Sequence, residues 1–190
     1  RYNSALQFIP ISQITGTGDG NQFYSLFRDS KGFYWFGGAN GLIRFTDPAG
    51  ERHDAIWYRM GDKTYPLSHN RIRHIYEDKE QQLWIATDGS INRYDYATRQ
   101  FIHYNIVDNT GTYNTNWTYY IFEDTAGQLW ISTCLGGIFV VDKRKLMQST
   151  SGQYIAEQNY SVHNGLSGMF INQIIPDNEG NVWVLLYNNK

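Results

Sequence analysis

Short runs of alternating apolar and polar residues cover most of the chain, and turn-forming residues separate one run from the next. Such runs predict β-strands, because successive side chains of a strand point to opposite faces of the sheet. Residues 72–77, 83–87 and 91–94 show the pattern well. No segment carries a long apolar period of 3.6 residues, and the best helix candidate is one turn at 143–148. The pattern therefore predicts an all-β protein.

A pair of residues, Asp followed six positions later by Trp, recurs four times along the chain. The pairs are Asp29 and Trp35, Asp78 and Trp84, Asp124 and Trp130, and Asp177 and Trp183. A Gly lies three residues after the Asp in every unit except the second, which has Gln81 there. Asp accepts hydrogen bonds from backbone N–H groups in a turn, and Gly tolerates positive φ. We interpret the Asp residues as turn formers and the Trp residues as wedges between units.

Each repeat predicts four strands. This is the number of strands in a β-propeller blade, which is a four-stranded antiparallel sheet. The third and fourth strands follow a Gly-rich turn, and the fourth is more polar, as at 55–59, 100–105 and 154–160. The expected units are an outer strand of an upstream blade at 5–12, blades at 22–60, 70–106 and 116–161, and a half blade at 170–187. We expect a single partial propeller of about 3.5 blades, cut from a longer protein. A β-sandwich remains the alternative, although a sandwich does not need such repeats.

Composition and charge narrow the range of partners. The chain has 190 residues and a formal net charge of −2, which argues against a basic nucleic-acid-binding face. It has no apolar stretch long enough to span a bilayer. The single Cys134 excludes an intrachain disulfide, and the five histidines lack the spacing of metal ligands, so we expect no metal and no cofactor. We expect the histidines to be ordinary surface residues, and the loop at 16–20 to be a plain flexible loop.

Candidate ligand-binding residues are those that depart from the repeat on one face of the blades. Loops that join strand four to the next strand one share a face with the turns between strands two and three, opposite the Asp turns. The candidates on that face are Tyr24, His69, Arg71, Arg73, Asn116, Trp117, Tyr119 and Asn172. Four of them, Tyr24, Arg73, Tyr119 and Asn172, are equivalent when the units are aligned on the repeated Asp. Aromatic planes beside Asn, His and Arg predict an oligosaccharide site, while packing between blades is the alternative.

The repeat motif resembles the two-component regulator propeller repeat. The resemblance rests on Asn70-Arg71-Ile72, Leu83-Trp84-Ile85-Ala86-Thr87 and Ile91-Asn92-Arg93-Tyr94-Asp95, and it recurs at 129–133. It extends over about residues 5 to 187. The resemblance implies the periplasmic sensor part of a membrane-anchored hybrid sensor histidine kinase from Bacteroidetes. It also implies a response to oligosaccharides, with polysaccharide-use genes regulated through a kinase outside this segment.

Three classes of function follow from these patterns. The first is a non-catalytic sensor propeller that binds an oligosaccharide. The second is a scaffold that binds only protein. The third is a propeller enzyme such as a lyase or glycosidase, which a pair of carboxylates with separated pKa values would support. Because the end blades are incomplete, we expect the remaining blades of a longer chain, or a second copy of this one, to cover them.

Overall fold

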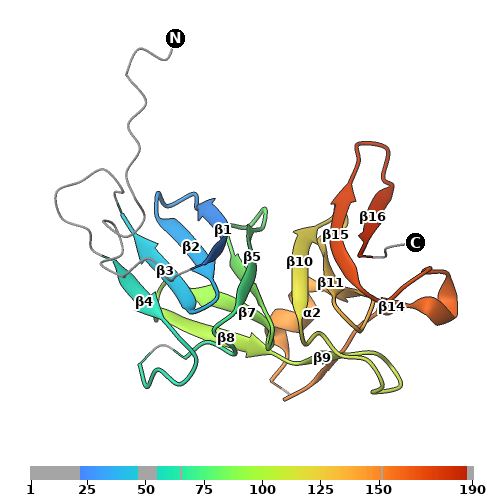
Figure 1. The fold of residues 1–190 in the computed structure, drawn as a ribbon, viewed down its shortest axis with the longest axis horizontal. Helices are drawn as coiled ribbons and strands as arrows, with labels where there is room; N and C mark the ends of the chain where they lie inside the picture. The colour runs from blue at the N-terminus through green and yellow to red at the C-terminus, as the bar shows by residue number, and fades with distance from the viewer. Residues whose placement is uncertain (1–21, 47–54, 65, 151, 188–190) are drawn as a thin grey trace, which may run out of the picture.

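The computed structural model describes residues 22–46, 55–64, 66–150 and 152–187, and it shows an all-β protein built of antiparallel sheets and a short parallel pair of strands (Figure 1). The first blade consists of β1 (Phe23–Arg28), β2 (Tyr34–Gly38), β3 (Gly41–Phe45) and β4 (Ile56–Tyr58), paired in that order. The second consists of β5 (Ile72–Glu77), β6 (Leu83–Thr87), β7 (Ser90–Asp95) and β8 (Gln100–Tyr104). Both blades have the simple up-and-down order that the repeat predicts.

The second half of the chain repeats this plan and then stops part-way. The third blade consists of β10 (Thr118–Glu123), β11 (Gln128–Thr133), β12 (Ile138–Asp142) and β14 (Gln158–Tyr160), and the last sheet pairs β15 (Ile171–Pro176) with β16 (Val182–Leu186). The helix expected at 143–148 is α2 (Lys143–Gln148), and a 3-10 turn covers Val162–Asn164. The partial-propeller fold class is thus confirmed. The outer strand expected at 5–12 and the loop at 16–20 lie outside the described residues.

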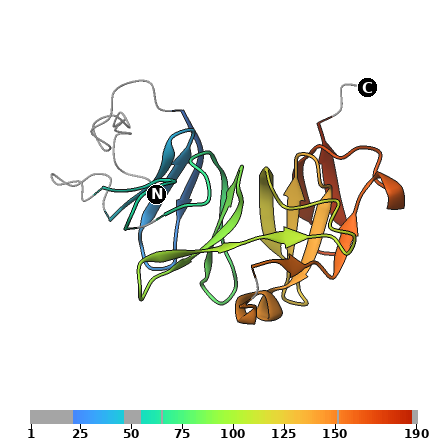
Figure 2. The ribbon, with the colours of Figure 1, turned by 90° about the horizontal axis from the view of Figure 1, so that it is seen from below.

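The sheets follow one another in an open arc, with the first and last sheets at its two ends (Figures 1 and 2). The first strand of each sheet lies on the inner side of this arc. β5 contacts both β1 and β10, and β10 also contacts β15. Residues at one level of these inner strands therefore come together, although they are far apart in the sequence.

The repeated Asp and Trp form one hydrogen-bonded unit in every blade. In the first blade, Asp29 Oδ1 accepts from the backbone N–H groups of Lys31 and Phe33, at 3.1 and 2.8 Å. Asp29 Oδ2 accepts from Trp35 Nε1 at 2.8 Å, and the three later pairs make the same bond at 2.9 Å. The turn needs a left-handed residue three positions after the Asp, and Gln81 adopts it with φ 61° where the other blades have Gly. The Asp therefore holds both the turn and the indole.

Burial of the four Trp residues differs along the chain. Trp35 and Trp84 are fully buried between blades, and Trp130 is partly buried. Trp183, by contrast, is 67% exposed and does not act as the wedge that its repeat position predicts. The reason is that no described segment packs on the outer face of the sheet formed by β15 and β16.

The strand expected at 154–160 is interrupted, and its two parts pair with different blades. β14 completes the third blade by pairing with β12. The preceding β13 (Tyr154–Ile155) runs parallel to β9 (Ile106–Val107), which follows the last strand of the second blade. The prediction of one continuous strand is therefore wrong: the chain first joins the neighbouring blade and only then returns to its own.

Among the described helices, none is long and apolar enough to cross a membrane.

Candidate functional site

A β-bulge occurs at the same position in all four inner strands. In each pairing with the second strand of the sheet, the register skips one residue of the inner strand. The skipped residues are Tyr24, Arg73, Tyr119 and Asn172, the four that the repeat alignment makes equivalent. A bulged residue leaves the ladder, so its side chain is re-aimed relative to its neighbours. The fold thus presents one non-repeated side chain from every blade at one level.

These four side chains line a single pocket of about 340 Å³, which we call the axial pocket. Its other lining residues are His74, Tyr120 and Gln173, which directly follow bulged residues in the sequence. Aromatic rings, amides and a guanidinium are therefore gathered at the inner strands. His74, Tyr120 and Gln173 were not among the sequence candidates, although their place next to the bulge is a signal that the alignment contains.

A buried carboxylate fixes the guanidinium of Arg73. Arg73 donates from Nε and Nη2 to the two carboxylate oxygens of Asp88, at 2.7 and 3.1 Å. Burial by itself would lower the pKa of Arg73, but the hydrogen bond and the charge of Asp88 outweigh it and raise the pKa. The guanidinium carbon lies 4.5 Å from the centre of the Tyr119 ring. Asp88, in the turn between β6 and β7, thereby positions Arg73 over an aromatic face.

His74 is a structural member of the pocket wall. Its ring stacks on Tyr120 with centroids 3.9 Å apart, and its Nδ1 accepts from the backbone N–H of Ile121 at 3.3 Å. Burial lowers the pKa of His74 to about 4, so the ring is neutral at pH 7. With Nδ1 as acceptor, the proton of the neutral ring is on Nε2. The expectation that every histidine is an ordinary surface residue is therefore wrong for His74.

Trp117 has an unusual backbone and an open ring. Its φ is 55°, the left-handed region that bulky residues rarely adopt, and its side chain is 46% exposed. Its backbone N–H donates to Asp88 O at 3.2 Å, and its carbonyl accepts from Cys134 N–H at 2.9 Å. The neighbouring blade and the turn after β11 thus hold the strained residue in place. Such strain persists where the surroundings over-determine it, which is frequent at binding sites.

The structure sorts the eight predicted residues into three groups. Four line the axial pocket, as described above. Asn116 and Trp117 line a separate pocket of about 380 Å³ with Asp88, Tyr113 and Leu135 among its walls. His69 and Arg71 line neither pocket. His69 Nδ1 accepts from the Arg71 backbone N–H at 3.0 Å, and the Arg71 guanidinium lies 3.8 Å from Asp88.

The side chains that could hold a metal ion are those of His, Cys, Asp and Glu. Across the part of the chain that the structure describes, no cluster of three or more His, Cys, Asp or Glu side chains is placed to hold a metal ion.

Comparison with known families decides what the repeats are. The sequence matches the two component regulator propeller at residues 17–40, 66–89 and 165–188. These three stretches carry the two component regulator propeller repeat. The third blade, which lies outside the matched stretches, nevertheless has the same Asp–Trp bond and the same inner bulge as its neighbours.

Two solved structures are nearly identical to the chain in sequence. The chain is 98% and 99% identical, with TM-scores of 0.92 and 0.93, to two structures of one extracellular domain from B. thetaiotaomicron, BT4673. That protein is described as a candidate one component system in one case and as a candidate hybrid two component system in the other. The match covers all of this chain but only 25% and 26% of those chains, so the segment spans about a quarter of their length.

More distant solved structures share the fold alone. The extracellular domain of BT3049 from the same organism is 22% identical over 94% of this chain and 23% of its own, with a TM-score of 0.71. Virginiamycin B lyase from Staphylococcus aureus is 14% identical over 88% of this chain and half of its own, with a TM-score of 0.60. No curated protein matches the chain.

Proposed function

We propose that this chain is a non-catalytic, ligand-binding segment of the extracellular sensor of a hybrid two component signalling protein. Both near-identical structures are of one extracellular domain, and one of them is described as part of a hybrid two component system, which supports the proposal. In this reading the segment faces the periplasm as part of a protein anchored in the inner membrane. A kinase outside the segment passes the signal to genes for polysaccharide use.

The proposed ligand of the axial pocket is an oligosaccharide. The observation that carries this is the bulge in every inner strand, which delivers Tyr24, Arg73, Tyr119 and Asn172 to one pocket. The bulge recurs in all four inner strands, yet its position is occupied by Tyr twice, by Arg once and by Asn once. A position with such varied polar and aromatic side chains serves a ligand better than it serves packing. Sugar rings stack on aromatic faces, and their hydroxyls bond amides.

The charges of the axial pocket favour hydroxyl groups over a strongly anionic ligand. Asp88 neutralises Arg73 and takes two of its N–H groups. The guanidinium carries five such donors, so three remain for acceptors in the pocket. His74 adds a neutral ring and Asn172 an amide. The pocket therefore combines neutral or neutralised donors with the rings of Tyr24 and Tyr119.

The test is binding of neutral oligosaccharides, measured by calorimetry and by the rise in melting temperature on ligand addition. The protein is the full extracellular relative with this segment in its place, because the segment alone leaves sheet faces bare. Tyr119→Ala should weaken binding about tenfold or more, equivalent to ~1.4 kcal/mol or more, while Thr125→Ala on the opposite face should leave it unchanged. If the Tyr119→Ala and Thr125→Ala variants bind the oligosaccharide equally well, the axial pocket is not its binding site. Binding of protein partners only would favour the scaffold.

A further inference from the structure

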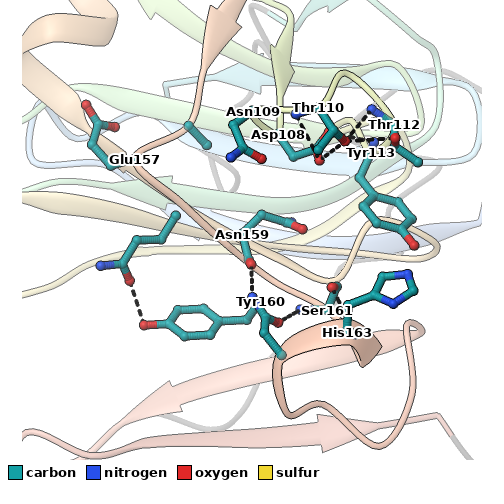
Figure 3. A pocket seen from close by; sticks show the side chains of 13 residues that line it. Asp108, Asn109, Thr110, Thr112, Tyr113, Glu157, Asn159, Tyr160, Ser161 and His163 are labelled. Carbon is teal, nitrogen blue, oxygen red and sulfur yellow. Dashed lines mark hydrogen bonds between the residues drawn. The ribbon is translucent and has the colours of Figure 1, made fainter.

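A pocket of about 690 Å³, larger than the axial pocket, lies at the outer edge of the third blade (Figure 3). We call it the rim groove; its walls are the loop 108–113 and the segment 156–164. The groove exists because β9 and β13 run parallel. Parallel strands end at the same edge, so the segments that follow Val107 and Ile155 leave the sheet side by side. None of the residues that line the axial pocket lines the rim groove.

The two carboxylates of the rim groove are occupied by donors of the chain itself. Asp108 Oδ1 accepts from the Tyr113 backbone N–H at 2.8 Å, and its Oδ2 accepts from the Thr110 hydroxyl at 2.5 Å. Glu157 Oε2 accepts from the backbone N–H of Asp142 at 2.8 Å, and its Oε1 accepts from the Tyr154 hydroxyl at 2.8 Å. Neither carboxylate is left as an open cation site. A ligand in the groove therefore meets the other polar side chains of its walls.

Three polar side chains in the groove bond no other described residue through their side-chain polar atoms. They are the Tyr113 hydroxyl, the His163 ring and the Asn109 amide. Figure 3 shows Tyr113 pointing toward His163, and the two ring centroids are 6.3 Å apart at 35°. Asn109 comes from the same loop as Tyr113, on the side of Asp108 (Figure 3). A hydroxyl, an imidazole and an amide around half-exposed rings are the groups that bind the hydroxyls and the apolar face of a sugar.

We propose that the rim groove is a second saccharide-binding site, separate from the axial pocket and specific for neutral sugars. Tyr113 supplies the stacking ring, while Asn109 and His163 bind hydroxyls. Thr112 and Tyr113 also line the pocket beside Trp117, so a longer ligand can extend from the rim toward that ring. The inference stands on the geometry of the rim groove and does not require the axial pocket to bind anything.

Calorimetric titration of the full extracellular relative carrying this segment tests the proposal. The probes are neutral tetrasaccharides of glucose, galactose, mannose and xylose, each titrated separately. The rim variant is Tyr113→Ala with Asn109→Ala, and the axial variant is Tyr119→Ala. Tyr113→Phe is the milder second variant, since it removes only the hydroxyl and keeps the ring. Thr125→Ala, exposed on the Asp-bearing turn, is the matched control.

Under the proposal, at least one probe binds and the rim variant weakens that binding at least tenfold, with Tyr113→Phe intermediate. If the same probe also fills the axial pocket, the stoichiometry falls from two to one in the rim variant. Two results overturn the rim site: no probe binds, or every bound probe is indifferent to the rim variant. Binding lost only in Tyr119→Ala leaves the proposed axial function intact and refutes the rim site. Binding lost only in the rim variant supports the rim site and refutes the proposed axial function.

Discussion

The hydroxyl of Tyr96 crosses from the second blade to the first and donates to Asp29 Oδ2 at 2.7 Å. The same oxygen accepts from Trp35 of its own blade. Burial, followed by the Asp29 hydrogen bond and charge, raises the pKa of Tyr96, so this hydroxyl remains a donor. Tyr96 directly follows β7, the third strand of its blade. The residue at that position therefore ties its own blade to the turn of the preceding one.

Lys143 occupies the equivalent position after β12. It ties its own blade to the turn of the preceding blade through an ion pair. Its Nζ lies 3.0 Å from Asp78 Oδ2, 3.1 Å from Glu80 Oε2 and 2.7 Å from Glu123 Oε1, and its side chain is only 1% exposed. Burial would lower the pKa of Lys143, but hydrogen bonds from the ammonium to these carboxylates raise it. The junction between the second and third blades therefore depends on one buried ion cluster.

Replacing Lys143 by Met should destabilise the protein by ~3–5 kcal/mol, because it leaves buried carboxylates without their cation. The measurement is urea denaturation at pH 7. Lys145→Met is the control: Lys145 lies on the same helix, but its side chain is 65% exposed, so its loss should change stability by less than about 0.5 kcal/mol. Similar midpoints for the two variants would show that the cluster adds no net stability.

Truncation of the repeated Trp residues should follow their burial and not their shared repeat position. Trp84→Ala should cost ~3–5 kcal/mol, as for a large buried aromatic. Trp130→Ala should cost somewhat less. The Trp130 ring stacks between the rings of Phe122 and Tyr160, with centroid distances of 5.9 and 5.7 Å, but it is only partly buried. Trp183→Ala should cost least in the isolated chain, because its ring is 67% exposed. Equal losses at Trp84 and Trp183 in denaturation curves would contradict this order.

Gln81 offers a stabilising substitution. It holds φ 61° in the turn where the first, third and fourth units have Gly. A left-handed non-Gly residue costs ~1–2 kcal/mol, while Gly adds back a smaller cost in chain entropy. Gln81→Gly should therefore stabilise the chain by up to about 1 kcal/mol. The reciprocal change, Gly127→Gln, should destabilise it; a gain from both changes, or from neither, in denaturant titrations would refute the strain argument.

Acid should weaken the contact between the second and third blades through His74. Its pKa is lowered from 6.5 to about 4 in the folded chain, so between those values the unfolded chain binds more protons. Stability from the neutral ring is complete above pH 6.5 and declines as the pH falls toward 4. Denaturation at a series of pH values should show that, as the pH falls through this range, the free energy of unfolding decreases more for the wild type than for His74→Gln.

The sequence is informative about this fold wherever local chemistry repeats. The Asp turns, the strand order and α2 follow from Asp, Gly and the alternating pattern, and the structure has them close to where they were expected. Equivalence of Tyr24, Arg73, Tyr119 and Asn172 was also readable, because alignment on the Asp places all four at one level. Repetition turns a weak local signal into a strong one.

Contacts between blades are what the sequence does not reveal. Asp88 resembles any turn residue until it meets Arg73 through space, and His74 resembles a surface histidine until Tyr120 of the next blade covers it. The pairing of β13 with β9 likewise depends on two blades meeting at their outer edge. Such contacts occur once each and leave no periodic pattern, so only the assembled structure shows them.

The last prediction is that the isolated 190-residue chain self-associates. Both ends of the arc present apolar side chains to solvent: Leu26 is 64% exposed on β1, while Trp183 and Leu185 are 67% and 53% exposed on β16. Contiguous apolar surface of this kind on sheet faces favours association in water.

Sedimentation at micromolar concentration should show dimers or larger species, which the Trp183→Ser, Leu185→Ser double variant should reduce. The exposed face of β16 carries both residues, so the change leaves the blade cores intact. Thr125→Ser, exposed on a turn, is the control. A monomeric wild type would mean that the bare sheets are tolerated in water, and association undiminished in the double variant would place the contact elsewhere. Coverage of the same face by further blades in a longer chain should make the longer protein monomeric at the concentrations where the isolated segment associates.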